Sequence, residues 1–249
     1  MKELCVISDI HSNIEALIAS VNEIKYMYGP VKIISLGDIV GYGPSPSECI
    51  HFIRCNNIES IAGNHDYAAA EVIGISDFNI NSRKSADWTR KSLSVGELEY
   101  LKGLPEKKVE DCLFFVHGSL HSPLHEYLIV DAAIERNFSL MSEGKICFAG
   151  HTHKPVIIKK DNTSGTIDTL VPEYNKKISI PVNDCSYIVN PGSIGQPRDG
   201  DPRSSFLYAN FDENYLVYTR MEYSVRLTQK KMAANCLPEF LIERIARGV

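Results

Sequence analysis

Residues that can bind metal ions follow five apolar, strand-like stretches of this sequence. They stand in the segments Asp9-Ile10-His11, Asp38, Asn64-His65-Asp66, His117 and His151-Thr152-His153. Because ligands of open α/β sheets lie outside the carboxyl ends of the strands, we expect these side chains to meet at one edge. Carboxylate oxygens mixed with imidazole nitrogens favour Mn, Fe, Zn, Ni or Co, whereas a calcium site would hold oxygen ligands alone. The ligands are too many for one ion, so the pattern predicts a two-metal hydrolytic centre.

Each motif has a plainer explanation when it is taken alone. Asp9 could cap the helix that follows it, and Asp38, which comes after a glycine, could be a turn or capping residue. The functional interpretation of Asp38 is a carboxylate that bridges two cations roughly 3.5–4 Å apart. Asn64 is a poor ligand in isolation, but its carbonyl oxygen can complete a metal shell. Two histidine-containing i, i+2 pairs together with His117 favour the metal interpretation.

The elements that must position these residues alternate strand and helix in the first third of the chain. We expect strands at 3–8, 31–36 and 58–62, a helix whose apolar face runs from Ile14 to Ile24, and a helix at about 46–55. This βαβαβ pattern predicts a mostly parallel sheet. Residues 66–104 are expected to be helical, with Trp88 as a core anchor and a capping box of Ser94 and Glu97.

The rest of the chain is expected to be richer in strands. The predicted strands lie near 107–109, 112–116, 145–149, 155–160, 166–170, 178–180, 186–189, 205–211 and 214–222. A helix is expected at about 131–141, and residues 161–185 are expected to form an exposed hairpin or loop insertion. Two short helices at 226–235 and 239–247, divided by Pro238, would form a C-terminal appendage. Since the candidate ligands are spread from position 9 to position 153, we expect residues 1–249 to form a single domain.

Composition narrows the classes of partner and compartment. The formal net charge of −5 gives no general attraction for nucleic acid or for anionic lipid. The chain has no apolar run long enough to span a bilayer, and Asp9 comes too early for a signal peptide. Seven scattered cysteines favour a reducing cytoplasm, with Cys5, Cys112 and Cys147 packed as small apolar strand residues. A homo-oligomer is left open, because apolar residues of the C-terminal segment could cover the core or a partner subunit.

The ordered motifs resemble the signature of the calcineurin-like metallophosphoesterase superfamily. That signature runs D-x-H, then G-D, then G-N-H followed by D or E, a later H, and finally G-H-x-H; all elements occur in order within residues 5–155. A closer resemblance is to a compact prokaryotic subfamily of uncapped phosphoesterases. It rests on GDIVGYGPSP, AGNHDYA, FNINSRKSADWTR, VHGS and NPGSIGQPRDGDPRSSF. The resemblance implies an α/β fold of two packed mixed β-sheets flanked by helices, an α/β/β/α sandwich.

The resemblance also implies a role for each residue of the motifs. One divalent metal would be held by Asp9, His11, Asp38 and His153, and the second by Asp38, Asn64, His117 and His151, with Mn favoured. Such ions lower the pKa of a bridging water, so that hydroxide can attack phosphorus at neutral pH. His65 would be the catalytic acid that protonates the departing oxygen, with Asp66 as its orienting partner.

Candidate substrate contacts lie outside the metal motifs. Tyr42 and Arg198 could touch the substrate, since an arginine fork matches phosphate. An equal alternative for Arg198, and for Arg203, is a salt bridge within the loop of residues 199–201. His121 and His125, in a Pro-containing loop, could line the entrance.

These residues predict dinuclear-metal-dependent hydrolysis of a small phosphoester, phosphodiester-like in character. One alternative is a dinucleoside-polyphosphate hydrolase, for which Tyr42, Tyr67 and Tyr127 are the candidate aromatic contacts. A second alternative is a non-catalytic scaffold on the same fold. His65 and the complete ligand set argue against a scaffold, and the lack of a basic stripe argues against a nuclease.

Overall fold

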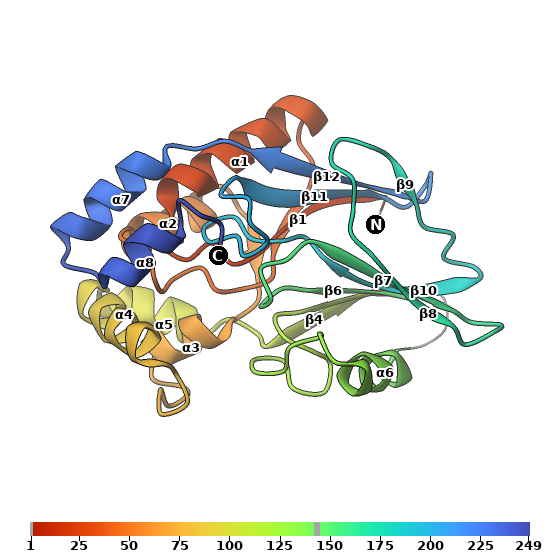
Figure 1. Ribbon diagram of the computed structural model, residues 1–249, viewed down its shortest axis with the longest axis horizontal. Coiled ribbons are helices and arrows are strands. Elements are labelled where there is room, and N and C mark those ends of the chain that lie inside the picture. The colour runs from red at the N-terminus through yellow and green to blue at the C-terminus, as the bar shows by residue number, and fades with distance from the viewer. Residues whose placement is uncertain (1, 142–144) are drawn as a thin grey trace.

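Two mixed β-sheets pack face to face in the computed structural model, which describes residues 2–141 and 145–249 (Figure 1). Within these residues the first sheet has six strands, in the order β3 (Glu59–Ser60), β2 (Ile33–Ser35), β1 (Glu3–Ile7), β11 (Ser204–Asn210), β12 (Tyr215–Met221) and β9 (Ile178–Ser179). The second sheet, over the same residues, has the order β4 (Lys107–Glu110), β5 (Leu113–Val116), β6 (Ile146–Ala149), β10 (Cys185–Asn190), β7 (Val156–Asp161) and β8 (Ile167–Leu170).

Alternation of side chains along the strands builds the layers. In β1, Leu4 and Val6 join a core cluster shared with the second sheet, whereas Cys5 and Ile7 face a cluster formed with helices. Phe115 and Phe148 enter the same inter-sheet core, with ring centroids 5.3 Å apart. The strands that carry the candidate ligands are parallel to their neighbours: β1 with β2, β2 with β3, and β5 with β6. Within each sheet the carboxyl ends of these strands therefore lie at one edge.

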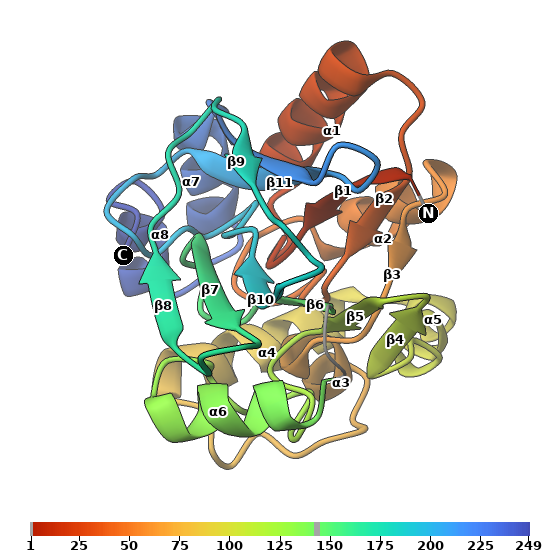
Figure 2. The same ribbon diagram turned by 90° about the vertical axis from the view of Figure 1, so that its right-hand side faces the viewer.

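Helices cover the outer faces of both sheets (Figure 2). The first sheet is covered by α1 (Ile14–Tyr28) and α2 (Pro46–Cys55), and the second by α6 (Asp131–Ser139), which packs through Ile134 and Phe138. The predicted α/β/β/α sandwich is confirmed. The C-terminal helices, α7 (Val225–Ala234) and α8 (Glu239–Arg244), and the turn between them form a hydrophobic cluster with Tyr42 through Met232, Leu241 and the turn residue Leu237.

The segment expected to be helical throughout is interrupted. It contains α3 (Asn64–Ala69), α4 (Ile80–Ser92) and α5 (Val95–Lys102), but residues 70–79 are not helical. Asn79 caps α4 by accepting hydrogen bonds from two backbone N–H groups, so a new helix starts there. The predicted capping box of Ser94 and Glu97 is present. Trp88 is only half-buried and packs against the C-terminal helices rather than inside the main core.

Two further expectations are corrected or refined. Cys112 is exposed, because it lies in the turn between β4 and β5, while Cys5 and Cys147 are buried as expected. Residues 161–185 start as the expected hairpin of β7 and β8, and then β9 pairs with β12 at the edge of the first sheet. Among the helices of residues 2–141 and 145–249, none combines the length and apolar character needed to cross a bilayer.

Candidate metal centre

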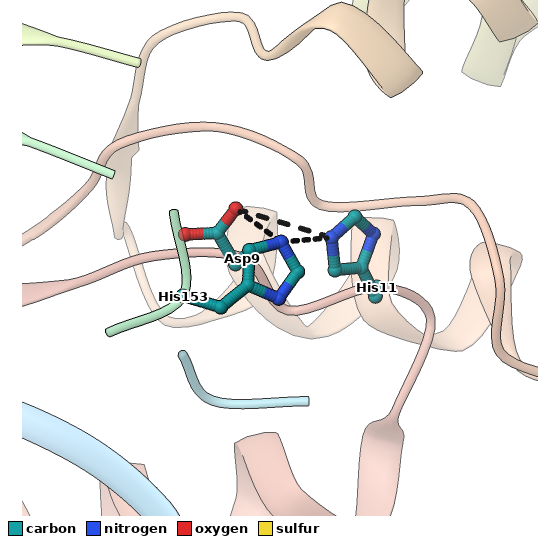
Figure 3. A group of neighbouring side chains, drawn as sticks. All are labelled: Asp9, His11 and His153. Carbon is teal, nitrogen blue, oxygen red and sulfur yellow. Dashed lines mark hydrogen bonds and ion pairs between the residues drawn. The ribbon is translucent and has the colours of Figure 1, made fainter. Parts of the chain in front are cut away.

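Asp9, His11 and His153 form the first group of candidate metal ligands. Asp9 and His11 follow β1 of the first sheet, and His153 follows β6 of the second. Figure 3 shows the three side chains converging: Oδ1 of Asp9 lies 3.1 Å from Nε2 of His153 and 3.9 Å from Nε2 of His11. The two Nε2 atoms are 3.2 Å apart. Three potential ligand atoms from two sheets therefore face one point.

Asp38, His117 and His151 form the second group. Nε2 of His117 lies 2.9 Å from Nδ1 of His151 and 3.3 Å from Oδ2 of Asp38. Asn64 joins them, with its Oδ1 3.2 Å from Nε2 of His117. Oδ2 of Asp38 is also 3.5 Å from Nε2 of His11, a member of the first group. Asp38 thus lies between the two groups, as a bridging ligand would.

Hydrogen bonds on the far side of three imidazoles fix which nitrogen is free. Nδ1 of His11 contacts the carbonyl of Val40 at 3.2 Å, Nδ1 of His117 that of Leu36 at 2.9 Å, and Nδ1 of His153 that of Gln196 at 2.6 Å. A carbonyl can only accept, so each Nδ1 carries the proton and each Nε2 of a neutral ring offers a lone pair to the site.

The donor set fits divalent metal ions. The seven candidate side chains are 7 % exposed or less, and Oδ1 of Asp9 is buried without any hydrogen bond. Clustered lone pairs and an unpaired carboxylate oxygen would repel one another unless a cation or proton lay between them. Mixed oxygen and nitrogen donors of this kind suit transition metals.

The backbone at the strand ends is strained. Asp9, His11, Asp38, His151 and His153 have φ between 48° and 64°, in the left-handed region that non-glycine residues rarely adopt. Such conformations concentrate at functional sites, where the surrounding structure imposes them. Gly63 lets two loops approach, since a Cβ there would lie 2.1 Å from Oδ1 of Asp38.

Burial and neighbouring charges set the protonation states. The pKa of His11 is held well below its usual value by burial, and that of His151 by burial and by His117, so both rings are neutral. Burial acts against ionised Asp38, but the adjacent His117 holds the pKa of that carboxyl well below its usual value. Conversely, Asp38 raises the pKa of His117 to about 9 despite burial. A cation bound by this pair would displace that proton.

Comparison with known proteins identifies the family. Residues 1–214 match the calcineurin-like phosphoesterase superfamily domain. The chain belongs to this superfamily. It is 37% identical over 252 residues to an uncharacterised protein of Methanocaldococcus jannaschii, with 98% of each chain covered.

Solved structures agree with the fold of this calcineurin-like phosphoesterase. A metallophosphoesterase from Sphaerobacter thermophilus is 37% identical, with a TM-score of 0.86 over 100% of this chain and 99% of that one. A hypothetical protein of Pyrococcus horikoshii OT3 is 21% identical and shares the fold, with a TM-score of 0.79 over 100% and 99% of the two chains.

His65 lies at the edge of the candidate metal centre. It is 5 % exposed, and burial lowers its pKa to about 4. Its backbone N–H donates to Oδ1 of Asp38, the carboxylate that lies between the two ligand groups. Asp66 does not take the expected role of orienting the His65 ring. Its two carboxylate oxygens accept the backbone N–H groups of Val40 and Gly63, at 3.0 and 2.9 Å.

A pocket of about 340 Å³ opens over the candidate ligands. It is lined by the candidate metal-site residues Asp38, Asn64, His65, His151 and His153, and also by Tyr42, Phe78, His125, Tyr127 and Arg198. The ring of Tyr127 stacks on that of His151, with centroids 3.9 Å apart. His121 is not among the residues that line this pocket. Phe78 is the first residue of the segment FNINSRKSADWTR, which resembles the family, but no pattern in the sequence indicates a role for it.

The structure separates the two arginines. Arg203 forms a salt bridge with Asp201, so the salt bridge within the loop, which the sequence offered as an alternative, is the one observed for Arg203. Arg198 lines the pocket, donates to Oε1 of Gln196, and keeps its buried Nε without a hydrogen-bond partner. Tyr42 also lines the pocket: its hydroxyl is 3.0 Å from Oγ of Ser82, and its ring centroid lies 4.6 Å from that of His11 and 4.3 Å from that of His65.

Proposed function

We propose that this protein hydrolyses small phosphoesters with two divalent metal ions, of which Mn is the first to test. The observation that carries the proposal is the pair of buried ligand groups that meet at Asp38 beneath an open pocket. One ion would be held by Asp9, His11, Asp38 and His153. The other would be held by Asp38, Asn64, His117 and His151.

The chain supplies the remaining parts of a phosphoester hydrolase. When bound, two such ions polarise the phosphoryl oxygens and provide the nucleophile at neutral pH. Arg198, which lines the pocket, would pair with a phosphoryl oxygen through its guanidinium group. His65, which also lines the pocket, would donate a proton to the leaving oxygen. The negative charge of a bound phosphoester would favour the protonated form that this step requires.

The pocket size indicates a small substrate. At about 340 Å³ it lies near the lower limit of ligand-binding cavities in proteins. A dinucleoside polyphosphate would have to extend beyond the pocket. Of the aromatic contacts nominated for that alternative, Tyr42 and Tyr127 line the pocket, whereas the hydroxyl of Tyr67 donates to the carbonyl of Leu104. We therefore propose a simple phosphodiester or phosphomonoester as the substrate class.

The test is hydrolysis by the purified protein loaded with Mn²⁺. We expect turnover of bis-p-nitrophenyl phosphate or p-nitrophenyl phosphate, slower turnover of diadenosine tetraphosphate, and loss of all activity in Asp38→Asn. Elemental analysis of both proteins checks that the variant has lost metal. A metal-loaded wild type that hydrolyses none of these esters would contradict the proposal and favour a scaffold.

A further inference from the structure

The His65 imidazole lacks the hydrogen-bonded partner that would be expected to orient a general acid. Its Nδ1 is buried and has no hydrogen bond within the described residues. Asp66, the adjacent carboxylate, accepts two backbone N–H groups, and neither of its oxygens is hydrogen-bonded to this Nδ1. Gly41 packs closely against this edge of the ring: a Cβ at position 41 would lie only 2.6 Å from Nδ1 of His65. Another interaction must hold the ring.

Aromatic rings surround the imidazole instead. The ring centroid of Tyr42 lies 4.3 Å away at an interplanar angle of 50°, and that of Phe78 lies 4.8 Å away at 45°. His11 contacts His65 edge-on at 5.1 Å. Tilted or edge-on rings at centroid distances of about 4.5–7 Å form favourable aromatic pairs, and the Phe78 and His11 contacts lie in this range while the Tyr42 contact is slightly closer. Packing can therefore restrict the rotation of His65 without a hydrogen bond.

Tyr42 is itself firmly anchored. Its backbone N–H donates to Oγ of Ser85, its hydroxyl contacts Ser82, and its ring packs against Met232 and Leu241 of the C-terminal segment. It forms a fixed wall on one side of His65.

Phe78 is held in a different way. It comes from the non-helical segment 70–79, one residue before the cap of α4, and it is half-buried. Within the part of the chain that the structure describes, Phe78 belongs to none of the four hydrophobic clusters. Among residues 2–141 and 145–249, the aromatic ring that it contacts is that of His65. Since the Phe78 ring contributes little to the hydrophobic core, its contact with His65 points to a role at the candidate site.

We propose that Phe78 is a positioning residue for His65. Together with Tyr42 it holds the imidazole where it can protonate the leaving oxygen. This inference rests on the proposed function, since it assumes that His65 is the acid. It does not require Phe78 to touch the substrate, although Phe78 also lines the pocket and could act as a binding wall.

The two roles of Phe78 differ in their dependence on the leaving group. A poor leaving group needs a proton in the transition state, whereas p-nitrophenolate leaves with little help. We expect Phe78→Ala to lower kcat for phenyl and alkyl phosphoesters by about tenfold or more, part of the 10²–10⁴ attributable to a general acid. The kcat for p-nitrophenyl esters should change by less than about threefold. Phe78→Tyr, which keeps the ring, should restore the wild-type pattern.

Three companion variants make the test decisive. His65→Ala shows the largest leaving-group effect that loss of the acid can produce. Ile75→Ala, from the same segment but outside the 340 Å³ pocket, should leave the leaving-group dependence unchanged. Phe78→Leu replaces Phe78→Ala if the latter does not fold. A second readout needs no turnover: the His65 ring resonance, assigned by its loss in His65→Ala, should shift and broaden in Phe78→Ala.

The outcomes separate this inference from the proposed function. A rise in KM with an equal effect on all leaving groups would make Phe78 a binding wall and overturn the inference. If His65→Ala shows the leaving-group effect and Phe78→Ala does not, the inference about Phe78 is also overturned. The proposed function, with His65 as the acid, would still stand. If the wild type hydrolyses no ester in the series, both fail.

Discussion

His11 and His153 face each other with their Nε2 atoms 3.2 Å apart, although 142 positions separate them and they follow strands of different sheets. Each ring donates its Nδ1 proton to a backbone carbonyl, so the facing nitrogens both present lone pairs. The second group also joins the two sheets, with Asp38 from the first sheet and His117 from the second. Metal ions bound here would cross-link the two sheets.

This arrangement predicts that metal removal destabilises the protein. A ligand that binds only the folded state, at a free concentration 100 times its Kd, stabilises it by about 2.7 kcal/mol. For a domain of this size that corresponds to a change in Tm of about 5–10 °C. We expect EDTA treatment followed by desalting to lower Tm by this amount and Mn²⁺ to restore it, as measured by calorimetry. An unchanged Tm would contradict binding between the sheets.

A methyl group at position 63 should disturb Asp38. The Cβ of Gly63→Ala would lie 2.1 Å from Oδ1 and 2.3 Å from the backbone nitrogen of Asp38, so the carboxylate must move. A displacement of about 1 Å can cost 10²-fold in rate. We expect at least that loss in kcat/KM, together with a lower metal content. The matched control is Gly96→Ala, whose Cβ would meet nothing within 4 Å and which should keep full activity.

The two arginines should differ in their effects on substrate binding. Charge-assisted hydrogen bonds contribute about 1.5–3 kcal/mol, so Arg198→Ala should lower kcat/KM for phosphoesters about 10- to 100-fold. Arg203 pairs with Asp201 at the surface, and Arg203→Ala should lower kcat/KM by less than about twofold. Steady-state kinetics on one diester tests both variants. Equal losses in the two would show that loop structure, not contact with the substrate, explains the Arg198 effect.

Asp66 should matter for stability more than for chemistry. Asp66→Ala would leave the N–H groups of Gly63 and Val40 buried without acceptors, at a cost of about 1–3 kcal/mol each. We expect urea denaturation to show a free energy of unfolding lower by about 2–5 kcal/mol. The exposed Asp87→Ala should change it by less than about 0.5 kcal/mol. An Asp66→Ala protein as stable as the wild type would show that the hydrogen bonds from Val40 and Gly63 to Asp66 do not stabilise the fold.

The grouping of the candidate ligands was predictable from the sequence because strand ends and short i, i+2 motifs are local features. The partner of Asp66 was not, because Val40 lies 26 positions away and its N–H carries no side-chain signal. Phe78 stands in a polar segment without periodicity, so only the tertiary structure shows it beside His65. Likewise, no local feature of the two residues of β9 indicates that the chain crosses there from the second sheet to the first, where β9 pairs with β12.

The left-handed backbone at Asp9, His11, Asp38, His151 and His153 bears on how such a protein could lose its activity in evolution. Asparagine tolerates this conformation far better than β-branched residues do. A change from His11 to Asn would remove one nitrogen donor and leave the loop in shape. Substitutions to Asn or Gly at these five positions would therefore be the first to give descendants that fold but lack the metal ligands.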